Sequence, residues 1–189
     1  MNRLAVYCGS SPGADPAFAD AARALGVEMA RRGIGLVYGG GRLGLMGIVA
    51  DAVLDSGGEA YGVIPQALID LEVAHTGLTE LHIVTTMHER KAKMTDLCDA
   101  FVALPGGIGT LDELFEAWTW NALGYHAKPF ALLNVAGFWD NLIEMMDHVV
   151  ASGFMSAPRR AQLLVTDDIG TAIDMLDSAL GARERKMVW

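Results

Sequence analysis

The chain has 189 residues, of which 52% are hydrophobic and 20% are charged. This composition excludes a disordered chain and suits one compact domain with a large core. The 14 basic and 23 acidic residues leave a formal net charge of −9, which argues against nucleic-acid binding because an acidic surface repels phosphate backbones.

Short apolar runs alternate along the chain with segments of helical periodicity. Seven runs predict buried strands, at residues 4–8, 34–38, 60–64, 81–85, 100–104, 130–133 and 163–165. Apolar residues at helical spacing predict helices between them, near residues 18–29, 46–53, 88–98, 109–123, 139–152 and 168–180. Gly33 and Gly57 are expected to end the first two helices. The alternation predicts an α/β fold in which helices cover both faces of a mainly parallel sheet of about seven strands.

The same pattern predicts one domain over residues 1–182, followed by a charged tail at residues 183–189. No uncharged apolar stretch reaches the roughly 18 residues that a membrane helix needs, and the first apolar run is too short for the core of a signal peptide. Cys8 and Cys98 offer neither a disulfide framework nor zinc-ligand spacing, which indicates a cytoplasmic protein. The histidines show no metal-binding pattern, so we expect no metal.

Ligands of open parallel sheets bind beyond the carboxyl ends of the strands, so the chemistry is sought in the turns there. Residues 39–44 read GGGRLG and match the dinucleotide pattern G-x-G-x-x-G formally. Glu59 has the spacing of a ribose-binding carboxylate but stands at the start of its strand, which is the wrong end. An NAD site therefore stays a weak alternative to a tight turn or to another ligand role.

The turn after Leu104 is more specific. Residues 105–113 read PGGIGTLDE, and glycines let a backbone approach a ligand closely. The N–H groups of the following helix, with the Thr110 hydroxyl, form a phosphate site. No lysine follows the last glycine, so this is not an ATP-hydrolysing P-loop. Thr110 and Glu113 also fit a capping box, but beside a glycine turn we favour a carboxylate that reaches the sugar of a bound phosphate ester.

Two further elements have a functional and a plain interpretation. Residues 87–91 read MHERK and open a helix, where the helix dipole disfavours cations. Arg90 and Lys91 therefore either meet an anion or form a solvated basic helix end. Cys8 is either an activated thiol or a small packing residue, and packing is favoured.

Together these segments resemble the Lonely Guy (LOG) family, the cytokinin riboside 5'-monophosphate phosphoribohydrolases, whose members were often mislabelled lysine decarboxylases. The resemblance rests on CGS at 8–10, GGG at 39–41, GLMG at 44–47, GVIP at 62–65, MHERK at 87–91 and PGGxGTxxE at 105–113, in family order. It implies a Rossmann-like three-layer, doubly wound fold and a homodimer with active sites near its interface. It also implies hydrolysis of the N-glycosidic bond of AMP or N6-substituted AMP without a cofactor.

The resemblance also implies roles for individual residues. Arg90 and Glu113 take the family's catalytic positions. The implied substrate-binding residues are Lys91, Gly106, Gly107, Ile108, Gly109, Thr110, Ser10, Gly40 and Met87, with Glu72 and Thr119 as less closely matched contacts; residues 66–76 depart from the family pattern.

The required chemistry agrees with these residue types. Cleaving a ribosyl–base bond builds positive charge on the sugar ring, and the carboxylate of Glu113 can stabilise that charge and orient water. Arg90, which is always protonated, can fix the phosphate or position Glu113. A non-catalytic AMP sensor and an NAD-linked oxidoreductase stay open as other classes of function.

Overall fold

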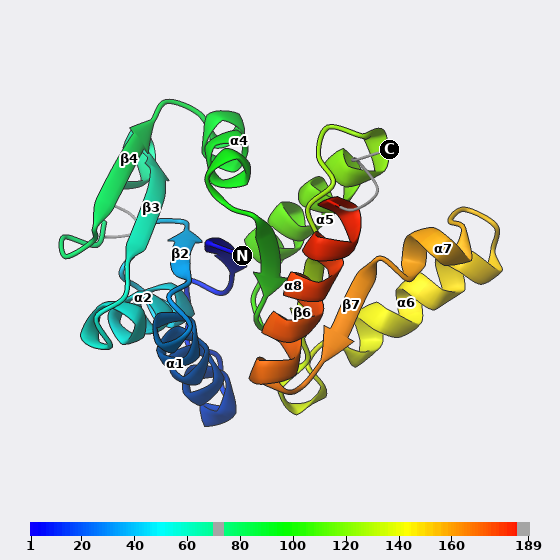
Figure 1. Cartoon of the computed structure of the whole chain (residues 1–189), viewed down its shortest axis with the longest axis horizontal. Coiled ribbons are helices and arrows are strands. Elements are labelled where there is room, and N and C mark those ends of the chain that lie inside the picture. Colours follow the sequence, from blue (N-terminus) through cyan, green and yellow to red (C-terminus); the bar gives the residue numbers. More distant parts are fainter. Residues whose placement is uncertain (70–73, 185–189) are drawn as a thin grey trace.

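The computed structural model describes residues 1–69 and 74–184. Seven strands form one sheet in the order β4-β3-β2-β1-β5-β6-β7, and every neighbouring pair runs parallel (Figure 1). The strands are β1 (Arg3–Tyr7), β2 (Gly35–Tyr38), β3 (Ala60–Pro65), β4 (Glu80–Val84), β5 (Ala100–Ala103), β6 (Phe130–Leu133) and β7 (Leu163–Thr166). The predicted parallel α/β fold is therefore confirmed. Glu72 and residues 185–189 of the predicted tail lie outside the described residues.

Helices cover both faces of the sheet and make three layers (Figure 1). One face carries α1 (Pro16–Arg31), α2 (Gly44–Asp55) and α8 (Ile169–Glu184), whose buried side chains share one core cluster. The other face carries α4 (Met87–Leu97), α5 (Ile108–Leu123) and α6 (Asp140–Ala151), which share the second cluster. This is the doubly wound arrangement that the alternating sequence pattern predicts.

The central strands are buried on both faces, which explains their continuous apolar sequences. In β1, Leu4 and Val6 join the cluster under α1, α2 and α8, whereas Ala5 and Tyr7 join the cluster on the opposite face. A strand between two helical layers has no solvent face, so it needs no polar alternation.

The ends of α1 and α2 lie where the glycines predict them, and the short elements are the ones that periodicity misses. Gly33 and Gly57 follow α1 and α2 with φ of 68° and 79°, a conformation that favours glycine. The single turn α7 (Ala157–Arg160) and the 3-10 turns η1 (Gln66–Leu68) and η2 (Val135–Gly137) are too short to show a helical period.

The strand order fixes where a ligand can bind. From β1 the chain builds outward through β2 and β3 to β4, and then returns to the other side of β1 with β5. The order therefore reverses between β1 and β5, and the connections that leave their carboxyl ends diverge there. Such a switch point is where ligands of open α/β sheets bind.

Close packing of α1 on α2 generates a stability prediction. A Cβ added at Gly26 would lie 2.7 Å from the Ala52 Cβ and from the Val49 carbonyl oxygen. We expect Gly26→Ala to lower the free energy of unfolding by about 1–3 kcal/mol, the usual cost of overpacking, and the melting temperature by about 2–4 °C per kcal/mol. Gly181→Ala in α8 is the matched control, since its added Cβ has nothing within 4 Å; we expect a gain of up to about 1 kcal/mol. Thermal denaturation that raises both melting temperatures would contradict the prediction.

Candidate active site

A cavity of about 310 Å³ opens at the switch point of the sheet, at the lower end of the size range of small-molecule sites. Its lining residues are Cys8, Gly9, Ser10, Met46, Arg90, Gly107, Ile108, Gly109, Thr110 and Glu113. They come from the turn after β1, from α2, from α4 and from the start of α5. The cavity thus brings together both residues predicted to be catalytic and much of the predicted phosphate turn.

The first turn of α5 faces this cavity with its backbone. Gly107 is the N-cap and makes no side-chain capping hydrogen bond, so the first N–H groups of α5 have no partner within the helix. Nothing lies within 4 Å of a Cβ built at Gly107 or Gly109, whose Cα atoms therefore border open space. Donors at a helix N-terminus, aided by the dipole, form an anion site.

Gly106 is a glycine for a different reason. A Cβ there would overlap Oγ1 of Thr110 and lie 2.9 Å from the Gly9 nitrogen. The Gly9 N–H donates to the Pro105 carbonyl at 3.1 Å, which joins the turns after β1 and β5. Gly106 therefore allows these two turns and the buried Thr110 side chain to pack together.

The capping-box interpretation of Thr110 and Glu113 is wrong. Thr110 is the third residue of α5 and not its N-cap. The capping box of this region lies instead at α4, where the Thr86 hydroxyl accepts the Glu89 N–H at 3.1 Å and the Glu89 carboxylate accepts the Thr86 N–H at 3.3 Å. Glu89 of the MHERK segment is thus a helix cap, while Glu113 lines the cavity.

Arg90 is held in place by backbone carbonyls. Its side chain is only 5% exposed; Nε donates to the Val63 carbonyl at 3.1 Å and Nη2 to the Gly39 carbonyl at 3.2 Å. Nη2 also lies 4.0 Å from Oε1 of Glu113, whose side chain is 12% exposed. A Cβ at Gly39 would overlap Nη2, so this position must be glycine for Arg90 to reach the sheet edge. The guanidinium is therefore fixed in place, and it stands beside the Glu113 carboxylate at the wall of the cavity.

The glycine turn after β2 is occupied by protein groups. Besides the contact between Gly39 and Arg90, a Cβ at Gly44 would overlap the backbone of Ser10 and Ser11. Glu59, the residue considered for a ribose, accepts a hydrogen bond from the Tyr61 hydroxyl at 2.8 Å. The turn that matches G-x-G-x-x-G is filled from within the chain, which leaves the NAD alternative without support.

A histidine that the sequence did not single out fixes the same turn. The His75 N–H donates to the Gly40 carbonyl at 3.0 Å. The ring Nδ1 accepts the Gly77 N–H at 3.1 Å, so Nε2 is the nitrogen left to donate to Asp51 at 3.0 Å. His75 thereby ties the chain before β4 to α2 and to the turn that holds Arg90. Its partner Asp51 lies 24 positions away, too far for a local motif to reveal.

Several predicted substrate-binding residues are not among those that line the cavity. They are Lys91, Gly40, Gly106, Met87 and Thr119. Lys91 faces α5, where Nζ lies 3.1 Å from Oδ2 of Asp112 and also contacts Glu116. Thr119 is exposed on α5, and the carbonyl of Gly40 is paired with His75. Conversely, Met46 lines the cavity; its place in the GLMG segment was the only signal for it.

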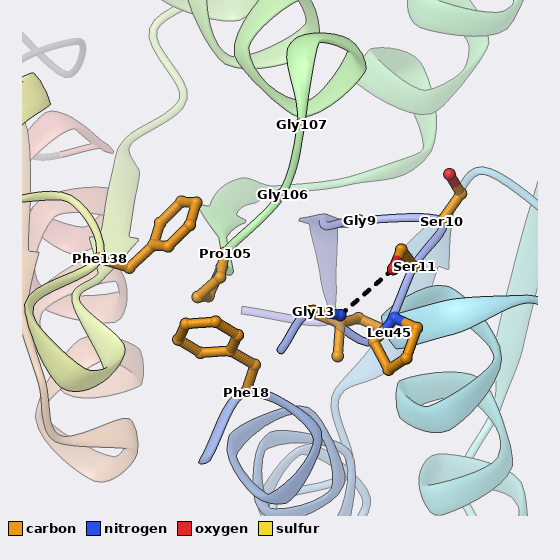
Figure 2. Close-up of a pocket in the computed structure, with 11 residues that line it drawn as sticks. Gly9, Ser10, Ser11, Gly13, Phe18, Leu45, Pro105, Gly106, Gly107 and Phe138 are labelled. Carbon is orange, nitrogen blue, oxygen red and sulfur yellow. Dashed lines mark hydrogen bonds between the residues drawn. The ribbon is translucent and has the colours of Figure 1, made fainter. Parts of the chain in front are cut away.

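A second hollow of about 290 Å³ adjoins the first and is mainly apolar. Figure 2 shows Phe18 and Phe138 with their rings beside Pro105, while the Ser10 hydroxyl points away from them. Gly9, Ser10 and Gly107 line both hollows. The crossing of the two turns therefore separates a polar compartment, which holds Arg90 and Glu113, from an aromatic one.

The fold and the site place the chain among the Rossmann-type α/β proteins that bind small ligands at a sheet switch point. The family model described as "Possible lysine decarboxylase" matches residues 46–176. The chain is 51% identical over 166 residues to the probable cytokinin riboside 5'-monophosphate phosphoribohydrolase LOGL1 of Oryza sativa subsp. japonica, covering 88% of this chain and 74% of that one. It is 46% identical over 176 residues to the cytokinin riboside 5'-monophosphate phosphoribohydrolase of Rhodococcoides fascians, covering 93% and 89%.

The chain belongs to this LOG family. Among solved structures, the molybdenum cofactor carrier protein of Chlamydomonas reinhardtii superposes with a TM-score of 0.70 at 20% identity, covering 96% of this chain and 99% of that one. At this identity the likeness concerns the fold alone. Among residues 1–69 and 74–184, no helix is long and apolar enough to cross a membrane, and no group of His, Cys, Asp and Glu could hold a metal ion.

The two buried thiols give a prediction about reactivity. Burial, aided by the charge of Glu113, raises the pKa of Cys8 well above its usual range, and burial raises the pKa of Cys98 to about 12. A raised pKa removes the nucleophilic thiolate at neutral pH. We expect neither thiol of the folded protein to react with Ellman's reagent at pH 8 within an hour, and both to react in denaturant. Rapid labelling of native Cys98→Ala protein would contradict this prediction and favour the interpretation of Cys8 as an activated thiol.

Proposed function

We propose that this chain hydrolyses the N-glycosidic bond of AMP and of N6-substituted, cytokinin-type riboside 5'-monophosphates. Water is consumed, and the products are the free base and ribose 5-phosphate. The observation that carries the proposal is the pairing of the buried Arg90 with the partly buried Glu113, in a cavity that the N-terminal turn of α5 also lines. Membership of the LOG family supports the same activity.

The 5'-phosphate is assigned to the turn formed by residues 107–110. Its N–H groups and the dipole of α5 supply positive potential without a mobile side chain. Glu113 stands one helical turn further along α5, so a phosphate on this turn brings the attached ribose beside the Glu113 carboxylate. Binding energy from the phosphate, which does not react, is then available to stabilise the transition state.

Glu113 is assigned the central chemical role. As the base departs, positive charge develops on the ribose ring, and a carboxylate in a partly dehydrated cavity stabilises that charge more strongly than water does. The same carboxylate orients or deprotonates the attacking water. Arg90 cannot act as a base; its carbonyl contacts fix the guanidinium, which positions Glu113 and adds positive charge for the phosphate.

We also propose that the protein is a cytoplasmic homodimer of this one domain. Apolar side chains are exposed on and beside α4 and α5, namely those of Met87, Ile108, Leu123 and Tyr125. Ile108, 84% exposed at the rim of the cavity, is the residue that a partner subunit would cover beside the site. The two free cysteines support a reducing compartment.

The proposed activity is tested by comparing AMP with adenosine. We expect AMP to yield adenine and ribose 5-phosphate, with kcat/KM for adenosine lower by about 100-fold or more because the α5 turn loses its partner. Chromatography of the products from both substrates, and from an N6-isopentenyl AMP, provides the measurement. Equal values for AMP and adenosine would contradict the phosphate assignment. Binding of AMP without turnover would instead favour the alternative of a non-catalytic AMP sensor.

The role of Glu113 is tested by Glu113→Gln, which keeps the side-chain shape and removes the charge. We expect single-turnover cleavage of bound AMP to slow by about 100-fold or more, a barrier increase of about 2.7 kcal/mol. The Kd for AMP changes much less, because ring charge has not developed in the ground state. Glu144→Gln, at an exposed position of α6, is the control and should match the wild type. Near-normal cleavage by a folded Glu113→Gln protein would rule out this assignment.

A further inference from the structure

We propose that Lys91 is a positioning residue: its ion pairs with Asp112 and Glu116 clamp α4 to α5 and so hold Arg90 and Glu113 at their working separation. This inference rests on the proposed function and deepens it. It assigns Lys91 no contact with the substrate, in contrast to the expectation from the family resemblance.

The geometry separates Lys91 from its neighbour Arg90. Successive helical residues point about 100° apart around the axis, and the two side chains leave α4 in different directions. The guanidinium of Arg90 reaches the carbonyls of Gly39 and Val63 at the sheet edge. The ammonium of Lys91 reaches across to α5 and is not part of the cavity lining.

The acceptors of Lys91 form one row on α5. Asp112 and Glu116 are four residues apart, so they stand one above the other on the same face. Lys91 Nζ donates to Oδ2 of Asp112 at 3.1 Å and contacts Oε2 of Glu116. Glu113, next to Asp112, points instead into the cavity. The clamp and the proposed catalytic pair thus occupy adjacent positions on both helices.

Burial makes this clamp costly to open. The Lys91 and Glu116 side chains are partly buried, at 13% and 14% exposed, and a charge removed from water is destabilising when it loses its partner. Burial lowers the pKa of Lys91, but hydrogen bonds to Glu116 and Asp112 outweigh it and hold that pKa above its usual value. An ammonium between two carboxylates also offers no net positive charge to a phosphate. Recruiting Lys91 to a substrate would leave Glu116, among the described residues, with the longer ion-pair contact to His88, at 3.7 Å.

The consequence lies in the positions of Arg90 and Glu113. These residues stand on different helices, and their closest charged atoms are 4.0 Å apart. A displacement of about 1 Å at a reacting centre can cost about 100-fold in rate. A clamp one residue away on each helix therefore acts on kcat, whereas a substrate contact would act on AMP affinity.

The test is a double-mutant cycle with Lys91→Met and Glu116→Gln, assayed with AMP. We expect each single variant to lower kcat by about 10-fold or more with KM within about 3-fold of wild type, and the double variant to be no worse than Lys91→Met, because both changes break one clamp. Lys91→Arg should retain most of the activity. Lys93→Met, on the same helix, is the matched control and should leave kcat and KM unchanged. Effects that multiply, or a KM raised about 10-fold with kcat intact, would overturn the proposal.

A second measurement separates this inference from the proposed function. AMP binding is measured by calorimetry in the Glu113→Gln background, where turnover is suppressed, with and without Lys91→Met. A Kd within about 3-fold supports the clamp, and a 10-fold weaker Kd makes Lys91 a ligand. If the wild type releases no adenine, the proposed function fails. In that case two measurements still decide whether the clamp exists. One is AMP binding in the wild-type background with and without Lys91→Met, and the other is the coupling between Lys91 and Glu116 in the free energy of unfolding.

Discussion

The burial of one guanidinium organises this end of the molecule. A buried ion without partners costs several kcal/mol or more, and Arg90 recovers that cost through the Val63 and Gly39 carbonyls. The two acceptors lie together because β2 and β3 pair in parallel as far as Tyr38 and Gly62, so that Gly39, just beyond β2, comes beside Val63 of β3 where α4 approaches. The capping box at Thr86 starts α4 one turn before Arg90, which sets the height at which the side chain enters. The strands, the start of α4 and the burial of the charge therefore together fix the position of Arg90, and the Glu113 carboxylate lies beside it.

The glycines of the site divide into two groups by what lies beside them. Gly39, Gly44 and Gly106 are glycines because another part of the protein fills the space of a side chain: Arg90, the Ser10 turn and Thr110 respectively. Gly107 and Gly109 have open space beside them, and only these two suit the close approach of a ligand to the backbone. A glycine pattern in the sequence does not distinguish the two groups. The distinction explains the difference between the two turns. The turn after β2 resembles a dinucleotide fingerprint but makes room for Arg90, whereas the turn after β5 leaves room for the proposed phosphate.

Much of the fold could be predicted because the physical signal is local. Strands buried on both faces read as continuous apolar runs, and glycines at φ of 68° and 79° mark the ends of α1 and α2. The failures come where identical local patterns have different surroundings. Thr86-x-x-Glu89 and Thr110-x-x-Glu113 share one pattern, yet only the first is a capping box, because α5 already begins after Gly107. The contacts of His75 with Asp51 and of Lys91 with Asp112 join segments 24 and 21 positions apart, and no local periodicity reports them.

Most charged side chains at the site are paired with an opposite charge, and this pairing limits what can attract a nucleotide. The chain carries a net charge of −9, so a dianionic nucleotide approaches an unfavourable surface. Lys91 is neutralised by Asp112 and Glu116, and Arg90 stands opposite Glu113. In the proposed site the attraction for a phosphate therefore comes largely from the backbone N–H groups of α5, which cannot swing toward the reacting bond. In the proposed reaction this matters, because positive charge grows on the ribose and a mobile cation would oppose it. The carbonyls of Val63 and Gly39 keep the charge of Arg90 in a fixed place, so under the proposed mechanism the carboxylate of Glu113 can balance the sugar while the cation beside it stays still.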